Sequence, residues 1–322
     1  MRLALHSTRV ALSCVLAIAF AAQAGAAVEP QQIKKGIFTV EYWLGDEQVA
    51  QDSLDTLEQT LSDFAQNLPG GGQPITVTIC RSLREFQHRA GQYGRAWVGG
   101  ISRTPSGQIA VKAPYLLPQP RDYDGLLRHE LLHVLLARNV QEAFLPRWLN
   151  EGIVMVLSKE NRWGSMARVA RMYVSGRLIP YYNLDFAFLP LGDEVLSGDA
   201  YAETLSMTRF LIDRLGEKGF WGLVRAMHQK PFETALLEAT GLKPGQFHEA
   251  WRDSMWMPAI VITATSAFSV FDIMVLIVIL AWFRKRRRNL AILEQWDEEE
   301  WAEGTWQNEY VSPDPWTEEE EE

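Results

Sequence analysis

The change in hydrophobic spacing near residue 120 constrains the fold more than any other feature of this sequence. Before that point, three short apolar runs are typical of strands, at residues 36–43, 74–80 and 107–112. Two segments with helical spacing lie among them, at residues 52–68 and 82–92. From residue 122 to 256 the spacing is helical, with breaks near residues 144–146, 179–192, 231 and 244. Strands followed by helices predict an α+β domain of about 230 residues.

The N-terminal segment reads as a secretory signal. Arg2 and Arg9 give it a positive start, residues 10–22 are apolar, and small residues follow at the spacing that a signal peptidase needs. We therefore expect residues 1–26 to be removed. The alternative is an uncleaved anchor, although the apolar core is short for a membrane crossing.

A second apolar stretch lies between Pro258 and Arg284. Its length predicts a transmembrane helix over residues 257–283, because 25 apolar residues rise about 37 Å against a hydrocarbon core of ~30 Å. Five basic residues follow at 284–288 and indicate that this end faces the cytoplasm. These signals predict a single-pass protein of the bacterial inner membrane, with a periplasmic domain over residues 27–256.

Charge is concentrated in the remaining segment, residues 284–322. This segment holds 5 basic and 13 acidic residues, most of the chain's net charge of −9. We expect it to be a disordered cytoplasmic tail. The domain that precedes it is nearly neutral, so it lacks the basic face that nucleic acids require. Within the apolar stretch, Asp272 either pairs with the transmembrane helix of a partner or is outweighed by its apolar neighbours.

Chemistry enters with the sequence His129-Glu130-Leu131-Leu132-His133, an H-E-x-x-H motif. On a helix, the two histidines share one face and can bind the same ion, while Glu130 can polarise a water on that ion. The alternative is a helix with two unrelated histidines. A second feature favours the metal: Glu151 follows eighteen positions after His133, at the start of another helix. Two histidines and one glutamate leave the fourth zinc position open, as a catalytic site requires.

These residues resemble a known family. The HELLH motif followed by Leu-Pro-Arg-Trp-Leu-Asn-Glu-Gly is similar to the peptidase MA-like zinc metallopeptidases, the gluzincin branch of the zincins. The resemblance covers roughly residues 36–230 and implies a zincin-like domain with a small N-terminal mixed sheet and a helical C-terminal half. It implies one zinc ion per chain, bound by His129, His133 and Glu151, with Glu130 as general base. The resemblance also implies that the strand at 107–112 forms a sheet edge beside the substrate.

Tyr201 is the remaining candidate for the site. It begins a predicted helix, which resembles the tyrosine-started helix that follows the zinc ligands in many gluzincins, so it would stabilise the oxyanion; otherwise it is an ordinary packing residue. The sequence departs from the family where thermolysin-like enzymes place a carboxylate that supports a ligand histidine, because Met155 occupies that position. The groups that orient the histidines are therefore unassigned.

Together these features predict a membrane-anchored zinc metallopeptidase, which hydrolyses peptide bonds of a peptide or protein substrate through a metal-activated water. The alternative is a catalytically silent zincin scaffold, a membrane-tethered binding or adaptor protein acting through its domain, Asp272 and the acidic tail. A purely structural zinc site is disfavoured, because only three protein ligands are visible.

Overall fold

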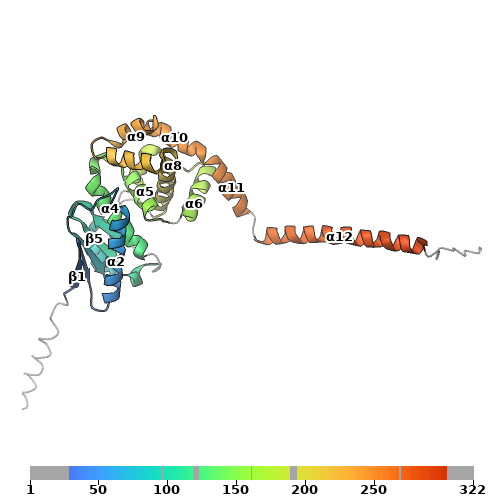
Figure 1. Cartoon of the computed structure of the whole chain (residues 1–322), viewed down its shortest axis with the longest axis horizontal. Helices are drawn as coiled ribbons and strands as arrows, with labels where there is room; N and C mark the ends of the chain where they lie inside the picture. The colour runs from blue at the N-terminus through green and yellow to red at the C-terminus, as the bar shows by residue number, and fades with distance from the viewer. Residues whose placement is uncertain are drawn as a thin grey trace, which may run out of the picture. The chain divides into compact units, whose positions relative to one another are not determined.

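The computed structural model describes residues 29–95, 97–118, 123–160, 162–188, 194–267 and 270–302 (Figure 1). The chain divides into two compact units, of which the first ends at Ile260 and the second begins at Val261. The predicted signal peptide, residues 1–26, lies outside the described residues, as do residues 303–322 of the predicted tail.

The described strands of the first unit form one mixed sheet, in the order β1-β2-β3-β5-β4. They are β1 (Gln31–Lys35), β2 (Phe38–Tyr42), β3 (Ile75–Cys80), β4 (Gly100–Arg103) and β5 (Gln108–Lys112). β1 and β2 form an antiparallel hairpin, while β2, β3 and β5 run parallel. β4 is antiparallel to β5 and ends the sheet on that side.

Helices cover the two faces of this sheet unequally. α2 (Glu47–Phe64) and α4 (Tyr123–Asn139) pack on one face, where Val77, Ile109 and Val111 are buried in the main core. α3 (Leu83–Ala90) packs on β3 and β5, and its Phe86 forms a separate small cluster with the outward-facing Ala110. Because strand side chains alternate between faces, α3 lies on the face opposite α4.

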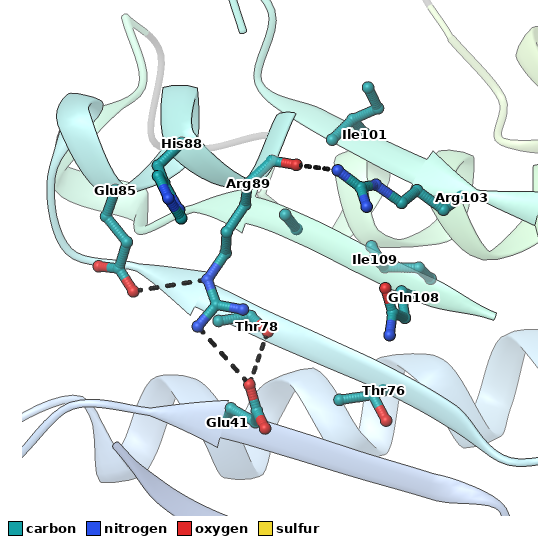
Figure 2. Close-up of a pocket in the computed structure, with 11 residues that line it drawn as sticks. Glu41, Thr76, Thr78, Glu85, His88, Arg89, Ile101, Arg103, Gln108 and Ile109 are labelled. Atoms are coloured by element: carbon teal, nitrogen blue, oxygen red, sulfur yellow. Dashed lines mark hydrogen bonds and ion pairs between the residues drawn. The ribbon is translucent and has the colours of Figure 1, made fainter. Parts of the chain in front are cut away.

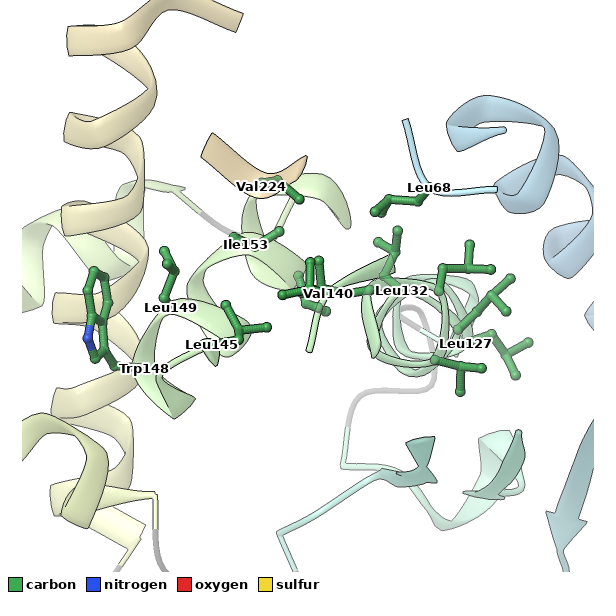
Figure 3. Close-up of a cluster of buried hydrophobic side chains, with 14 of the residues drawn as sticks. Leu68, Leu127, Leu132, Val140, Leu145, Trp148, Leu149, Ile153 and Val224 are labelled. Atoms are coloured by element: carbon green, nitrogen blue, oxygen red, sulfur yellow. The ribbon is translucent and has the colours of Figure 1, made fainter. Parts of the chain in front are cut away.

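The rest of the first unit is helical. Its α-helices are α5 (Arg147–Leu157), α6 (Arg162–Val174), α7 (Leu184–Ala187), α8 (Glu194–Ala226), α9 (Phe232–Thr240) and α10 (Pro244–Ser254). α5 lies against α8 and also against α4. Leucines around α4 and the apolar residues of α5, including Leu149 and Ile153, belong to one continuous core (Figure 3). α8 is interrupted at Gly216, whose φ of +66° is not helical.

Several predicted elements are confirmed, and three details of the sheet are corrected. Predicted strands at 36–43, 74–80 and 107–112 correspond to β2, β3 and β5, and Ser82 caps α3 by accepting the backbone N–H of Glu85. β1 was not predicted because it is largely polar, and β4 was not predicted because it has only four residues. The segment 107–112 is not an edge, since β5 pairs with β3 on one side and β4 on the other.

The predicted fold class is wrong in its final element. No helix in the described part of the chain is long and apolar enough to cross a membrane. The apolar stretch is divided between α11 (Trp256–Ala267) and the start of α12 (Val270–Ala302). Before the basic run begins at Arg284, residues 270–283 of α12 rise about 21 Å, less than a hydrocarbon core of ~30 Å. The same finding overturns the predicted single-pass placement in the inner membrane. Asp272, which was predicted to lie within the membrane span, is an exposed residue in the first turn of α12.

The predicted disorder of the tail is also wrong for residues 284–302, because α12 continues to Ala302. This segment consists mainly of arginine, leucine, glutamate, glutamine and alanine, all of which favour helix. Its charge composition was therefore a poorer guide to local structure than its helix propensity.

Candidate metal centre

α4 places the first two site residues. Its leucines at 127, 131, 132, 135 and 136 are fully buried, so the helix is held from several sides. One helical turn separates His129 from His133, and both side chains lie largely buried on the same face. Glu130 is also buried, with 6% of its surface exposed. The packing of α4 therefore fixes all three side chains.

α5 supplies the third candidate ligand, Glu151. The helix lacks a capping side chain at its own N-cap, Pro146. Instead the backbone N–H of Trp148 donates to the carboxylate of Asp185, 2.9 Å away, in the first turn of α7. Gly152 lets α5 approach α8 closely, because a Cβ at this position would overlap the hydroxyl oxygen of Thr208. Contacts from two distant segments thus hold Glu151 in place.

The three predicted ligands converge. Nε2 of His129 lies 3.0 Å from Nε2 of His133, and Oε2 of Glu151 lies 3.7 Å and 3.6 Å from these two nitrogens. One ion can lie about 2 Å from all three atoms of such a triangle, which is the bond length of zinc to histidine nitrogen or carboxylate oxygen. Oε2 of Glu151 is buried and has no hydrogen-bond partner within the described structure. The donor set therefore fits a zinc ion, and it is the one group of this kind found among the described residues.

Each histidine is oriented through its other ring nitrogen. Nδ1 of His129 lies 2.6 Å from Oε1 of Glu160, and Nδ1 of His133 lies 2.8 Å from Oδ1 of Asn150. These oxygens only accept, so in the neutral form that binds a metal each ring carries its proton on Nδ1 and turns its Nε2 lone pair to the ligand position. Such outer hydrogen bonds are a regular feature of metal-binding histidines. They fill the role that was unassigned from the sequence.

Glu160 reaches the site through a left-handed backbone turn. Lys159, which precedes it, has a φ of +63°, the left-handed conformation that follows many helix ends. This turn sends the chain back from α5 toward α4, and the hydroxyl of Ser158 also lies 3.3 Å from the Glu160 carboxylate. No helical spacing links Glu160 to Glu151, so the sequence holds no local signal for the role of Glu160.

Burial and neighbouring charges shift the pKa values of the site residues in opposite directions. Burial lowers the pKa of His129, but the hydrogen bond to Glu160 and the surrounding carboxylates together raise it to about 9. Burial raises the pKa of Glu151, but the nearby histidines His133 and His129 lower it overall. Without a cation between them, His129 and Glu151 thus stabilise each other's charged form. A divalent cation would take over this role.

The edge strand β4 lies directly against Glu130. A Cβ on Gly100 would come within 2.8 Å of both Cγ and Oε1 of Glu130. Ser102, two residues further along the same face, also acts on the Glu130 carboxylate, whose pKa it lowers. Burial raises the pKa of Glu130, whereas His129, His133 and Ser102 oppose that rise. A carboxylate with a raised pKa can accept and return a proton near neutral pH.

Tyr201, the candidate oxyanion stabiliser, lies within α8 and borders the same group. The carboxylate of Glu151 is the main cause that raises the pKa of its phenol, followed by burial and by the charges of Glu130 and Glu160. Its ring packs edge-on against Phe188, with centroids 5.1 Å apart, and 38% of the residue is exposed. The fold therefore brings Tyr201 near the ligands and leaves it accessible.

No protein-family model and no curated protein matches this sequence. The chemistry of the centre must therefore be argued from its geometry.

Proposed function

We propose that the protein is a zinc-dependent peptidase, with one zinc ion per chain held by His129, His133 and Glu151. The observation that carries the proposal is the convergence of the two Nε2 atoms and the Glu151 carboxylate. Both histidine rings are oriented by hydrogen bonds at Nδ1, and Glu130 lies next to His129 in the chain. A structural zinc site needs no such buried carboxylate outside the ligand set.

Zinc bound here would polarise the substrate carbonyl and lower the pKa of a water molecule. Glu130 accepts the proton of that water at its carboxylate and then passes the proton to the nitrogen of the leaving amine. Tyr201 retains its phenolic proton because the pKa of this group is raised, so it can donate a hydrogen bond to the carbonyl oxygen as that oxygen becomes negative.

β4 offers a place for the substrate backbone. It pairs only with β5 among the described strands, so its other edge presents unpaired N–H and C=O groups. An extended peptide added to this edge would run past Glu130, which contacts Gly100 and Ser102 of the same strand. This arrangement favours a peptide over a small polar substrate.

The first experiment separates metal binding from hydrolysis. Purified full-length protein should contain about one zinc ion per chain, and the His133→Ala variant should lose it, because two of three ligands cannot hold the ion at nanomolar affinity. Glu130→Gln should keep the zinc while its cleavage of a quenched fluorescent peptide library falls by roughly 10²–10⁴-fold. Glu142→Gln, a change at an exposed position in the short helix Glu142–Phe144, serves as the matched control.

Two results would contradict the proposal. Full activity of Glu130→Gln would exclude Glu130 as the base. Zinc in the wild-type protein without cleavage of any peptide would instead favour the silent scaffold.

A further inference from the structure

A pocket of about 520 Å³ opens on the sheet face that α2 and α4 leave uncovered (Figure 2). Its floor consists of side chains from β3 and β5, and α3 forms one wall. On β4, Ile101 and Arg103 line this pocket, whereas Gly100 and Ser102 face Glu130. Because side chains alternate along a strand, the pocket lies on the opposite face of the sheet from the candidate metal centre.

The two carboxylates of the pocket are already hydrogen-bonded by neutral donors. Glu41 accepts the hydroxyl of Thr78 at 2.9 Å. Glu85 accepts the indole N–H of Trp43 at 3.1 Å and the backbone N–H of Arg81, also at 3.1 Å. Both carboxylates therefore accept hydrogen bonds without using the N–H groups of the arginines beside them.

The cationic side chains, in contrast, keep most of their donors. The guanidinium of Arg89 lies 3.8 Å from Glu41 and 3.7 Å from Glu85, too far for a hydrogen bond. Within the described residues it makes no hydrogen bond of its own. Arg103 uses one N–H, which donates to the backbone oxygen of Arg89 at 2.7 Å. Figure 2 shows both arginines in the pocket, with the Gln108 amide nearby.

We propose that this pocket binds a small molecule through an oxyanion, either a phosphate or a carboxylate group. Arg89 and Arg103 provide the planar N–H pairs that recognise such groups in two-point contact. A volume of about 520 Å³ is within the range of small-molecule sites. The nearby carboxylates restrain Arg89 without accepting hydrogen bonds from it, so the two arginines keep more N–H donors than the pocket has acceptors for them. This surplus of donors predicts a negatively charged ligand. The site is independent of the proposed peptidase.

The test is calorimetric titration of the full-length protein with inorganic phosphate and, separately, with succinate, at constant ionic strength. We expect saturable binding of at least one of them. Arg89→Gln and Arg103→Gln should each weaken it about tenfold or more, the effect of losing a charged hydrogen bond. Arg84→Gln is the matched control, because Arg84 lies on the same helix, is exposed and does not line the pocket.

The outcomes separate the sources of the anion. Binding of phosphate alone assigns a tetrahedral group, and binding of succinate alone assigns a carboxylate. The His133→Ala variant should bind the anion as well as the wild type, since it alters only the metal centre. Loss of anion binding in that variant would show that the anion binds at the zinc, and would overturn the proposal. No saturable binding, or equal weakening by Arg84→Gln, would also overturn it. Arg103→Gln keeps the test valid if Arg89→Gln fails to fold.

Discussion

At the scale of single residues, the histidine ligands depend on two partners that no motif describes. Glu160 and Asn150 fix the ring orientation of His129 and His133 through Nδ1, at 2.6 Å and 2.8 Å. Free rotation of either ring would scatter the position of its Nε2. The partners should therefore contribute to zinc affinity without touching the ion.

We predict that Glu160→Ala weakens zinc binding by about 10–100-fold. The variant leaves all three ligands in place, but His129 loses the acceptor that holds its ring. Competition with a chromophoric chelator measures the change, and Glu142→Ala provides an exposed control. An unchanged zinc affinity would mean that the packing of α4 alone orients His129.

Cys80 is a core-packing residue and not a reactive thiol. It is fully buried in the small cluster with Phe86 and Ala110. Burial is the main cause that raises the pKa of this thiol from 9.0 to about 12, with Glu85 adding to the effect. The thiol is therefore neutral throughout the ordinary pH range and has little nucleophilic character.

We predict that Cys80 in the folded protein does not react with iodoacetamide at neutral pH and reacts after unfolding in urea. The sign of the accompanying pH effect follows from the raised pKa: stability is unaffected below pH 9 and falls between 9 and about 12, where only the unfolded chain ionises this thiol. Mass spectrometry of the alkylated protein gives the result. Rapid labelling of the native chain would show that the cluster opens.

At the scale of secondary-structure elements, the site depends on close contacts that glycines allow. α5 carries Glu151 and packs on α8, and Gly152 stands where the two helices meet. A Cβ there would lie 2.9 Å from Cγ2 of Thr204 and would overlap the hydroxyl oxygen of Thr208. Both threonines are fully buried, so neither can move aside freely.

We predict that Gly152→Ala destabilises the protein by about 1–3 kcal/mol, the usual cost of overpacking. Urea unfolding followed by circular dichroism measures it. Gly222→Ala, in α8 itself, is the matched control, because a Cβ there meets nothing within 4 Å. That change should be neutral or stabilise by up to about 1 kcal/mol, the gain of alanine over glycine in a helix. Equal effects of the two variants would contradict the packing argument.

The edge strand makes a similar contact with the proposed base. We predict that Gly100→Ala retains zinc and lowers peptide hydrolysis by about 10²-fold, because its Cβ would displace the Glu130 carboxylate by a fraction of an ångström or more. Zinc content and peptidase rate are measured on the same sample. Gly245→Ala in α10, where a Cβ also meets nothing within 4 Å, is the control. Loss of zinc in Gly100→Ala would indicate a wider disturbance of α4.

These contacts show which parts of the site a sequence can reveal. His129, Glu130 and His133 lie within one helix, so their arrangement follows from helical spacing alone. Glu160 depends on a left-handed residue after α5, and Ser102 depends on a strand of four residues. Local spacing contains neither relation, because both arise from tertiary structure. The same limit explains why the sequence does not reveal that β4, and not β5, is the edge of the sheet.

At the scale of the whole molecule, hydropathy summed along the sequence was misleading. The apolar stretch at 259–283 counts as one segment, but α11 ends at Ala267 and α12 begins at Val270. The division between the two units also falls inside α11, after Ile260, four residues beyond the domain end predicted at 256. Packing explains this boundary: Met255 and Ala259 are 4% and 1% exposed.

We predict that residues 29–260 alone bind one zinc ion and unfold at the same urea concentration as the full chain, because the core and the metal centre lie within the first unit. Residues 29–256 should unfold earlier, by about 1 kcal/mol, since that cut removes the buried Ala259 and exposes its neighbours. Zinc analysis and urea unfolding of the three chains make the comparison. If the 29–260 chain lost zinc or unfolded earlier than the full protein, the second unit would have to stabilise the first. Identical behaviour of both short chains would place the end of the domain at the first residue of α11, where the sequence predicted it.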